Sequence, residues 1–325
     1  MKSKKLGWTD LELTRVGLGT WAIGGGNWEF AWGPQDDERS IATIHKAIDL
    51  GINWIDTAAV YGLGHSEEVV GRAIAGMSDR PYIATKCSML WNEEGKIYRS
   101  LHRESIIAEA ERSLKRLDIE VIDLYQIHWP QPAEDIEEGW RAIEELMNAG
   151  KIRYGGVSNF NVSQMQRAQA IHRIASLQPP SSMLRRDVEN EILPYCQEHD
   201  IGVINYSPMQ KGLLTGKVDS EWVRSLPEDD HRKDDPMFNE PELSINLSFV
   251  EQLGNIADAA GKTLPQLAIA WTLRRPEITA AIVGARKPDQ ILETAQAADW
   301  TMSTEEIAEV EKLLQQREKD LEAAG

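Results

Sequence analysis

Four polar residues, each at or just beyond the end of a short apolar run, have the types needed for acid–base chemistry. They are Asp56, Tyr61, Lys86 and His128, and the runs beside them include I-N-W-I, P-Y-I-A-T and V-I-D-L-Y-Q-I. A carboxylate, a phenol, an ammonium and an imidazole can together transfer a proton and stabilise an oxyanion. Each residue alone has an ordinary explanation, such as a turn cap, a loop aromatic, a rim charge or a buried histidine with a partner. Their chemistry therefore depends on whether the fold brings them together.

Eight short apolar or β-branched runs, beginning at about residue 16, predict eight parallel strands. Amphipathic stretches between the runs, such as R-E-S-I-I-A-E-A-E-R-S-L-K-R-L at 103–117, predict helices with solvated outer faces. Eight βα units close into a barrel, and a barrel gathers the ends of its strands at one mouth. The predicted strands are Val16–Trp21, Trp54–Thr57, Tyr82–Lys86, Val121–His128, Tyr154–Ser158, Ala175–Gln178, Gly202–Tyr206 and Ala280–Val283.

Three segments depart from this alternation. K-K-L-G and L-E-L-T-R near the N-terminus predict a hairpin that closes the barrel floor, and Ser303 followed by Glu306 predicts the start of a C-terminal surface helix. Residues 211–243 have turn and charge signals without periodicity, which is typical of disorder or, as we prefer here, of a lid over the mouth. The predicted fold is a single α/β domain over residues 1–325, a (β/α)8 TIM barrel with an N-terminal hairpin, a long loop after strand seven and a C-terminal helix.

Composition and charge restrict the classes of partner. The chain has 35 basic and 52 acidic side chains and a net charge of −17, which argues against nucleic acid or an anionic membrane as a general partner. It has no apolar run of about 18 residues and no apolar signal segment, so we expect a soluble, unexported protein. Cys87 and Cys196 form no C-x-x-C pattern, so a reducing cytoplasm fits best. The oligomeric state stays open.

Other types of functional site find little support in the sequence. Residues 17–22 match G-x-G-x-x-A, the dinucleotide fingerprint of doubly wound folds, but the following I-G-G-G-N-W is a poor start for the helix that this fingerprint requires. The seven histidines include no H-x-H and no H-E-x-x-H, so no metal site is predicted. G-x-S-x-G is missing too, which leaves hydrolysis a weak alternative.

Six segments closely resemble the aldo-keto reductase family, in its bacterial, NADPH-dependent form. They are D-T-A-A-V-Y-G-L-G-H-S-E-E, A-T-K-C, Y-Q-I-H-W-P, G-V-S-N-F, Y-S-P-M-Q-K-G-L-L-T-G-K and I-V-G-A-R-K-P-D-Q, in this order. The resemblance extends from about Val16 to Trp300. It implies a (β/α)8 barrel that binds an extended nicotinamide dinucleotide across its mouth. It also implies that Asp56, Tyr61, Lys86 and His128 form a catalytic tetrad.

The tetrad suits the reduction of aldehydes and ketones. Hydride addition to a carbonyl carbon leaves negative charge on oxygen, so the site needs an acid and oxyanion stabilisation at one point. Tyr61 is the expected acid, and we expect the charge of Lys86 to lower its pKa from about 10. Asp56 would keep Lys86 protonated, and His128 would hydrogen-bond the carbonyl oxygen. Two alternatives stay open: an NADP-dependent alcohol or polyol dehydrogenase working in reverse, and an NADPH-binding regulatory subunit with little turnover.

The resemblance also assigns cofactor contacts. Ser158, Asn159 and Gln178 would hydrogen-bond the nicotinamide carboxamide, and Tyr206 would stack on the ring. Arg286 would bind the 2′-phosphate, which favours NADPH and NADP⁺ over NADH. The full predicted set is Gly19, Thr20, Trp21, Asp56, Ser158, Asn159, Gln178, Tyr206, Ser207, Pro208, Met209, Gly212, Leu213, Lys217, Gly284, Arg286, Gln290, Glu293 and Thr294.

Aromatic residues in or beside the βα loops predict an apolar pocket for a small carbonyl substrate, whose identity stays open. The predicted pocket residues are Trp21, Trp28, Trp32, Tyr61, Trp91, His128 and Trp129. Two positions depart from the family pattern. Ser181 follows Q-P-P where many relatives have Tyr, which would enlarge or loosen a pocket, and Thr294 follows Glu293 where Asn is frequent, which puts one adenine contact in doubt.

Overall fold

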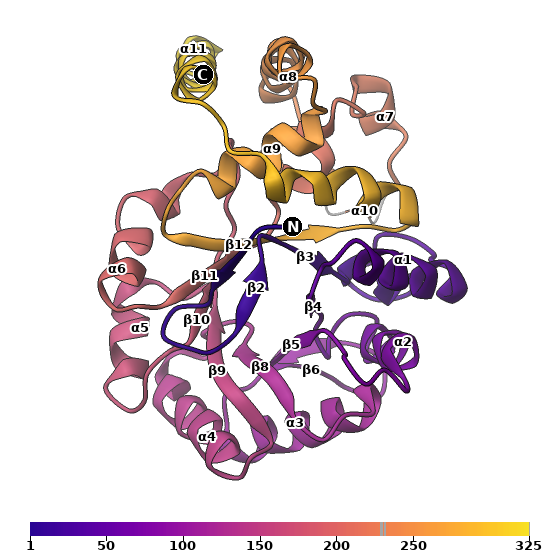
Figure 1. Ribbon diagram of the computed structural model, residues 1–325, viewed down its shortest axis with the longest axis vertical. Coiled ribbons are helices and arrows are strands. Elements are labelled where there is room, and N and C mark those ends of the chain that lie inside the picture. Colours follow the sequence, from indigo (N-terminus) through magenta and orange to yellow (C-terminus); the bar gives the residue numbers. More distant parts are fainter. Residues whose placement is uncertain (228–229, 231, 325) are drawn as a thin grey trace.

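The apolar runs of the sequence become the strands of a closed parallel barrel in the computed structural model, which describes residues 1–227, 230 and 232–324 (Figure 1). Strands covered by helices on one face and by the barrel interior on the other are buried on both faces, which is why their sequences are nearly continuously apolar. Around the barrel the order is β10-β11-β12-β3-β4-β5-β8-β9. The strands are β3 (Val16–Gly19), β4 (Trp54–Asp56), β5 (Tyr82–Cys87), β8 (Ile122–Ile127), β9 (Ile152–Ser158), β10 (Ser176–Gln178), β11 (Gly202–Asn205) and β12 (Ile278–Gly284).

The predicted barrel and its strands are thus confirmed, with shifted ends. The first strand ends at Gly19 instead of Trp21, because the chain turns directly into the 3-10 helix η1 (Trp21–Gly24). The last strand begins at Ile278, earlier than predicted, and extends to Gly284. These shifts leave the strand ends, and therefore the side chains that follow them, at one mouth of the barrel.

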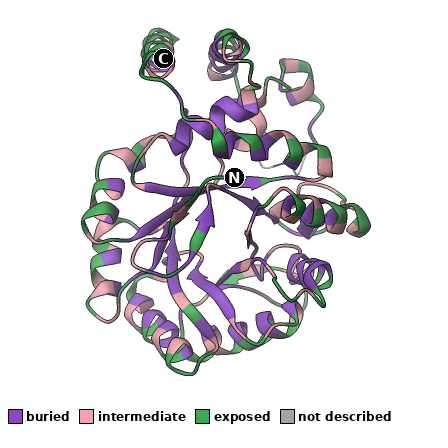
Figure 2. Ribbon diagram, viewed as in Figure 1, coloured by how far each residue is buried: buried purple, intermediate pink, exposed green. Residues whose placement is uncertain are grey.

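Helices cover the outside of the barrel with their apolar faces turned inward (Figure 2). In α3, for example, Ile106, Ala110 and Leu114 are buried, as their spacing predicts. The α-helices are α1 (Asp37–Asp49), α2 (His65–Ile74), α3 (Arg103–Leu117), α4 (Ile136–Asn148), α5 (Val162–Gln169), α6 (Ile192–Glu198), α7 (Ser220–Arg224), α8 (Glu242–Ala259), α9 (Leu264–Leu273), α10 (Pro288–Thr294) and α11 (Thr304–Ala324). Besides η1, the 3-10 helices are η2 (Ala133–Asp135), η3 (Asp187–Glu189), η4 (Gln210–Thr215), η5 (Pro236–Phe238) and η6 (Ala295–Asp299).

The N-terminal hairpin closes the floor of the barrel, as predicted. Strands β1 (Ser3–Lys5) and β2 (Glu12–Thr14) pair antiparallel. Leu6 and Leu11, which lie between them, are almost completely buried and pack in one cluster with Trp54 from β4. The floor is therefore filled by side chains, and the polar residues at the opposite strand ends remain the ones that can meet a ligand.

Two segments near the mouth contain regular structure that the sequence did not reveal. Strands β6 (Met89–Trp91) and β7 (Ile97–Arg99) form a short antiparallel hairpin after β5. The long loop after the seventh barrel strand is confirmed, and it contains short helices that its lack of periodicity did not predict. It contains η4, α7 and η5, and α8 begins before residue 243. Asp219 caps α7, since its side chain accepts a hydrogen bond from the Trp222 amide at 2.7 Å.

The predicted C-terminal helix is present as α11 and lies beside α8 (Figure 1). Its start has the expected capping box, with Glu306 N donating to Ser303 Oγ at 3.1 Å and Ser303 N donating to Glu306 Oε2 at 2.6 Å. Arg317 joins α11 to α8 through Asn246 at 2.7 Å. Within the described residues, no helix combines the length and the apolar character needed to cross a membrane.

Candidate active site

The barrel brings the four polar residues together at its mouth. Asp56 is the last residue of β4, and Lys86 lies near the end of the neighbouring β5. The Lys86 ammonium donates to Asp56 Oδ1 at 2.6 Å and to the Tyr61 hydroxyl at 3.4 Å. The His128 ring lies edge-on to the Tyr61 ring, with 5.8 Å between their centroids. A carboxylate, an ammonium, a phenol and an imidazole thus surround one point.

A close backbone approach holds Tyr61 in this position. Gly62, the next residue, has a φ of +62°, and a Cβ at this position would lie 2.1 Å from the Gly24 carbonyl oxygen in η1. Only glycine fits such a contact in the left-handed region. The Tyr61 ring then stacks on Trp21, with 6.2 Å between centroids and 16° between planes.

Lys86 is completely buried but has a partner for each of its N–H groups. Its third acceptor is the Thr57 carbonyl oxygen at 2.8 Å, in addition to Asp56 and Tyr61. Burying an ammonium is tolerable when a counter-ion and hydrogen bonds replace its water. Burial lowers the pKa of Lys86, and the adjacent Asp56 carboxylate opposes this effect. Asp56 is therefore the main counter-ion of the Lys86 ammonium.

The structure corrects our expectation for Tyr61. Burial, followed by the negative charge of Asp56, raises the pKa of Tyr61 well above its ordinary value, whereas we expected Lys86 to lower it. The physical reason is that Lys86 is already paired with Asp56 at 2.6 Å and is only 3.4 Å from the phenol, while the site as a whole is desolvated. Tyr61 therefore stays protonated at neutral pH, which is the form that can donate a proton.

His128 is neutral in this environment. Burial, followed by the positive charges of Lys86 and Arg99, holds the pKa of His128 well below its ordinary value. Both backbone polar groups of His128 are hydrogen-bonded. Its amide donates to the Cys87 carbonyl at 3.1 Å, and its carbonyl accepts from Asn159 Nδ2 at 3.0 Å. A neutral imidazole next to the phenol can donate one N–H to a carbonyl oxygen.

The predicted carboxamide residues form one hydrogen-bonded group beside the tetrad. Gln178 Nε2 donates to Asp56 Oδ2 at 2.8 Å and to Gln126 Oε1 at 3.3 Å, so its own Oε1 is left to accept from an amide. Asn159 Nδ2 also donates to Ser158 Oγ at 3.1 Å, in addition to the His128 carbonyl. Gln126, a fully buried polar residue of β8, was not among the predicted site residues, and its only signal in the sequence was its place two residues before His128.

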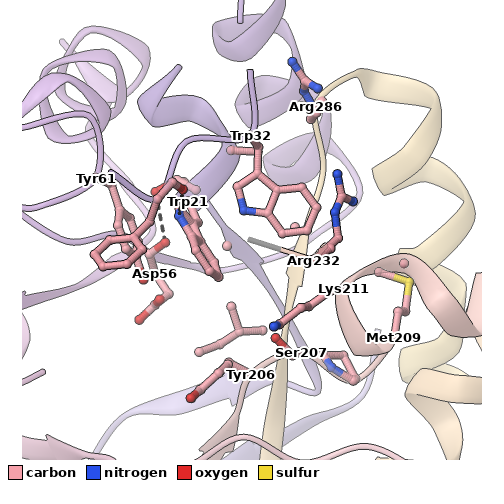
Figure 3. A pocket seen from close by; sticks show the side chains of 18 of the residues that line it. Trp21, Trp32, Asp56, Tyr61, Tyr206, Ser207, Met209, Lys211, Arg232 and Arg286 are labelled. Carbon is pink, nitrogen blue, oxygen red and sulfur yellow. Dashed lines mark hydrogen bonds between the residues drawn. The ribbon is translucent and has the colours of Figure 1, made fainter. Parts of the chain in front are cut away.

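A cavity of about 510 Å³ opens above these residues and extends across the mouth. Tyr61 and Asp56 lie at one end and Arg232 and Arg286 at the other, with Tyr206 between them on the lower wall (Figure 3). The Tyr206 hydroxyl donates to Asn159 Oδ1 at 2.9 Å, and burial raises the pKa of Tyr206 to about 12. An elongated cavity with a flat aromatic wall and a basic far end has the shape and the donor set that suit a nicotinamide dinucleotide.

Most of the residues predicted from the sequence line this cavity. All predicted cofactor residues except Leu213 do so, and so do all predicted pocket residues except Trp91. Leu213 is instead fully buried in an apolar cluster that includes Phe249 of α8 and Trp271 of α9. Trp91 comes two residues after Met89 in β6 and lies further from the barrel. The Arg116 guanidinium carbon lies 5.9 Å from the centroid of the Trp91 ring. Lys86 reaches the cavity only through Asp56 and Tyr61.

The two positions that depart from the family pattern lie in different surroundings. Ser181 is buried and does not line the cavity, and its amide donates to the Tyr206 carbonyl at 3.2 Å. The expected enlargement of a pocket at Ser181 stays a prediction. Thr294 lines the cavity, but its hydroxyl donates to the Gln290 carbonyl within α10 at 2.9 Å.

The far end of the cavity has a basic residue held by neutral groups. The Arg286 guanidinium donates to Gln35 Oε1 at 2.9 Å and to the Pro34 carbonyl, while Gln290 Oε1 accepts from the Arg286 amide at 2.8 Å. Because these acceptors are uncharged, they leave the positive charge of Arg286 available to an anion. Burial, followed by the nearby positive charges of Arg232 and Arg39, lowers the pKa of Arg286.

Several further lining residues were missed by the sequence analysis. Arg232 lies between the rings of Trp32, at 4.5 Å, and Trp222, at 4.8 Å, and bridges the long loop to the loop after β3. It comes from a stretch without periodicity, so its position depends on tertiary contacts. The other missed lining residues include Phe30, Val60, Met89, Arg99, Lys211, Thr215 and Val218.

Comparisons with known proteins agree with this geometry. The model of the aldo/keto reductase family matches residues 15–315. The aldo-keto reductase YhdN of Bacillus subtilis (strain 168) is 41% identical over 310 residues, covering 94% of this chain and 92% of that protein. The NADH-specific methylglyoxal reductase of Escherichia coli (strain K12) is 35% identical over 317 residues, covering 93% and 95% respectively.

The solved structures show the same relationship. The glycerol dehydrogenase AKR11B4 from Gluconobacter oxydans superposes with a TM-score of 0.89 at 39% identity, covering 97% of this chain and 96% of that chain. The sequence match, the barrel and the arrangement at its mouth thus point to the same group of proteins. The chain belongs to the aldo/keto reductase family, oxidoreductases that act on carbonyl compounds or polyols with nicotinamide cofactors.

Proposed function

We propose that the protein, acting as a single catalytic domain over residues 1–325, reduces aldehydes or ketones to alcohols with NADPH. The observation that carries this proposal is the Tyr61 phenol, kept protonated by burial at 3.4 Å from the Lys86 ammonium, at the end of an aromatic cavity. A protonated phenol in such a place can complete the reduction of a carbonyl that receives a hydride.

Each residue of the tetrad has a distinct part in this proposal. The nicotinamide cofactor, when bound, supplies the hydride. Tyr61 donates its proton to the carbonyl oxygen, and neutral His128 donates an N–H to the same oxygen and orients it. Lys86 stabilises the phenolate that forms, and Asp56 holds Lys86 in place at 2.6 Å.

The other end of the cavity supports a dinucleotide with an additional phosphate. We assign Arg286 to the 2′-phosphate, because among the described residues its guanidinium has only uncharged acceptors and a guanidinium can engage a phosphate through two N–H groups. The Escherichia coli relative is NADH-specific, so the preference for NADPH is a property to be measured for this chain.

The test of the mechanism is the Tyr61→Phe variant. Removal of one hydroxyl should lower the rate of NADPH oxidation with a generic aldehyde by about 10²- to 10⁴-fold, because the acid is lost. NADPH binding, followed by quenching of tryptophan fluorescence, should stay within about twofold of the unmodified protein, since the hydroxyl is proposed to act on the substrate. Turnover close to that of the unmodified protein would refute Tyr61 as the acid.

A second candidate is oxidation of an alcohol or polyol with NADP⁺, for which Tyr61 would act as base. Two observations favour it: the glycerol dehydrogenase from Gluconobacter oxydans superposes closely, and the same residues serve both directions. Initial rates with a panel of aldehydes and NADPH, compared with a panel of polyols and NADP⁺, separate the two. Cofactor binding without turnover in either panel would instead support a regulatory subunit.

A further inference from the structure

The register of the β6–β7 hairpin turns an arginine toward the cavity. Arg99 pairs with Met89 across the two strands, and cross-strand partners lie on the same face. Met89 is buried, and both residues line the cavity. Tyr98 pairs with Leu90 and has the opposite orientation, whereas Arg99, although exposed, lines the open rim of the cavity. Alternation along three residues therefore places a cation at the substrate end of the mouth.

The side chain of Arg99 is held against the segment that follows His128. Its guanidinium carbon lies 5.7 Å from the ring centroid of Trp129. The hairpin is tied to the same segment through Ser88, whose carbonyl accepts from Ser100 N at 3.2 Å and whose Oγ accepts from Trp129 N at 3.3 Å. A guanidinium resting on an indole face keeps its N–H edges available for a planar acceptor.

The charge of Arg99 has no carboxylate partner among residues 1–227, 230 and 232–324. Three other basic residues that line the cavity do have one: Lys211 pairs with Asp235 at 2.8 Å, Lys217 with Glu293 at 3.8 Å and Arg232 with Asp230 at 2.6 Å. The positive charge of Arg99 also reaches the reacting end of the cavity. It is the third contribution, after burial and Lys86, to the low pKa of His128.

We propose that Arg99 determines substrate specificity by binding a carboxylate, so that the preferred substrates are aldehydes or ketones with a carboxylate at the end remote from the carbonyl. This specificity rests on the carbonyl reduction proposed above and names its substrate class. The carbonyl oxygen would lie between Tyr61 and His128, the carbon chain or ring against Trp129, and the carboxylate on the N–H edge of Arg99.

A carboxylate fits this position better than a phosphate. Arg99 is the one basic side chain among the described lining residues at the substrate end, where it pairs with Met89 and packs on Trp129. A single planar guanidinium matches the charge and the two oxygens of a carboxylate, whereas a phosphate of nearly two charges would have only one cation to pair with at this end of the cavity. The chain as a whole has a net charge of −17, so an anionic substrate needs such a local cation.

The experiment compares para-carboxybenzaldehyde with its methyl ester, which differ in charge at the end remote from the aldehyde. We expect the unmodified protein to have the higher kcat/KM for the acid. In Arg99→Met, which keeps an apolar side chain against Trp129, the ratio of acid to ester should fall about tenfold through a higher KM for the acid. The ester should be unaffected, and Arg99→Lys should keep part of the preference. Raising the salt concentration should weaken the preference of the unmodified protein.

A matched control removes a neighbouring charge from the same hairpin. Lys96 is exposed and does not line the cavity, so Lys96→Met should leave the ratio of acid to ester unchanged. Equal losses for acid and ester in Arg99→Met would show that Arg99 has only a structural role, and an unmodified protein without a preference for the acid would refute the specificity. Absence of turnover with both aldehydes would instead defeat the proposed carbonyl reduction itself.

Discussion

At the scale of single residues, burial decides the protonation of the candidate site. The Asp56 carboxylate accepts from Lys86 on one oxygen and from Gln178 on the other, so it is the shared anchor of the tetrad and of the predicted carboxamide group. Because Lys86 is paired, it does not turn Tyr61 into a phenolate before substrate binds. The pKa of Tyr61 is raised by burial and by Asp56, so the phenol keeps its proton at neutral pH in the free protein.

This protonation state predicts opposite pH profiles for the two directions of the reaction. The raised pKa of Tyr61 means that the proton-donating form is lost only as the pH rises above about 10, so kcat/KM for reduction should be nearly constant from about pH 6 to about pH 9. Alcohol oxidation requires the phenolate and should become faster with rising pH over the same range. Initial rates in both directions test this. A fall in the reduction rate between about pH 7 and about pH 9 would contradict it.

At the scale of elements, the buried face of α3 contains an acidic residue, although the amphipathic pattern of this helix predicts only apolar residues there. Glu109 is 2% exposed, between the buried Ile106 and Ala110. Its Oε2 accepts from the Ser88 amide at 3.1 Å, directly before the β6–β7 hairpin, where Ser88 has a φ of +77°. Burial, opposed in part by the Ser88 hydrogen bond, raises the pKa of Glu109 to about 8. The helix thus supports the hairpin that presents Arg99 to the cavity.

Glu109 should make the stability of the protein depend on pH. Because its folded pKa of about 8 lies above the ordinary 4.5, the stabilisation from the neutral carboxyl is complete below about 4.5 and is lost as the pH rises through about 8. Glu109→Gln removes the titration, so its Tm should rise relative to that of the unmodified protein between about pH 4.5 and about pH 8 and then stay level. Thermal melts at several pH values measure this difference.

The control for that measurement is Glu104→Gln, a change at an exposed position of the same helix. It should reproduce the pH dependence of the unmodified protein. If Glu109→Gln and Glu104→Gln showed the same slope of Tm against pH, the buried carboxyl would not be the source of the dependence.

At the scale of the whole molecule, the mouth is built from segments far apart in the sequence. Arg286 after β12 donates to Gln35 and Pro34 in the loop after β3, and the Gln35 amide donates back to the Arg286 carbonyl at 2.9 Å. Arg232 joins the long loop to the same region through Trp32. A chain with a net charge of −17 thereby gathers basic side chains at one end of one cavity.

The dinucleotide preference follows from this arrangement. Arg286→Ala should raise the Kd for NADPH by about tenfold or more and that for NADH by less than about threefold, because only NADPH has a 2′-phosphate. Titrations followed by tryptophan fluorescence measure both constants. Lys312→Ala, on the exposed part of α11, removes the same charge away from the cavity and should change neither constant. Equal losses for NADPH and NADH in Arg286→Ala would defeat the assignment.

The sequence by itself determined the barrel and the place of its chemistry. Buried strands need apolar runs, amphipathic helices need periodic ones, and parallel strands must end at one mouth, so Asp56, Lys86 and His128 could be placed at strand ends without coordinates. The Ser303 capping box and the N-terminal hairpin were predictable for the same reason, since both depend on neighbouring residues.

Only the tertiary structure decided how the site is tuned and lined. The direction of the Tyr61 pKa shift depends on burial and on the pairing of Lys86 with Asp56. Both arise from residues that are far apart in the sequence. Arg99 lines the cavity because it pairs with Met89, near the end of β5, whereas Trp91 pairs with Ile97 further out along the hairpin and does not line it. Two paired strands of three residues each are too short to leave a pattern in the sequence. Local spacing thus specifies the strand ends that carry the tetrad, whereas desolvation and long-range packing set the charge of these residues and the other side chains around them.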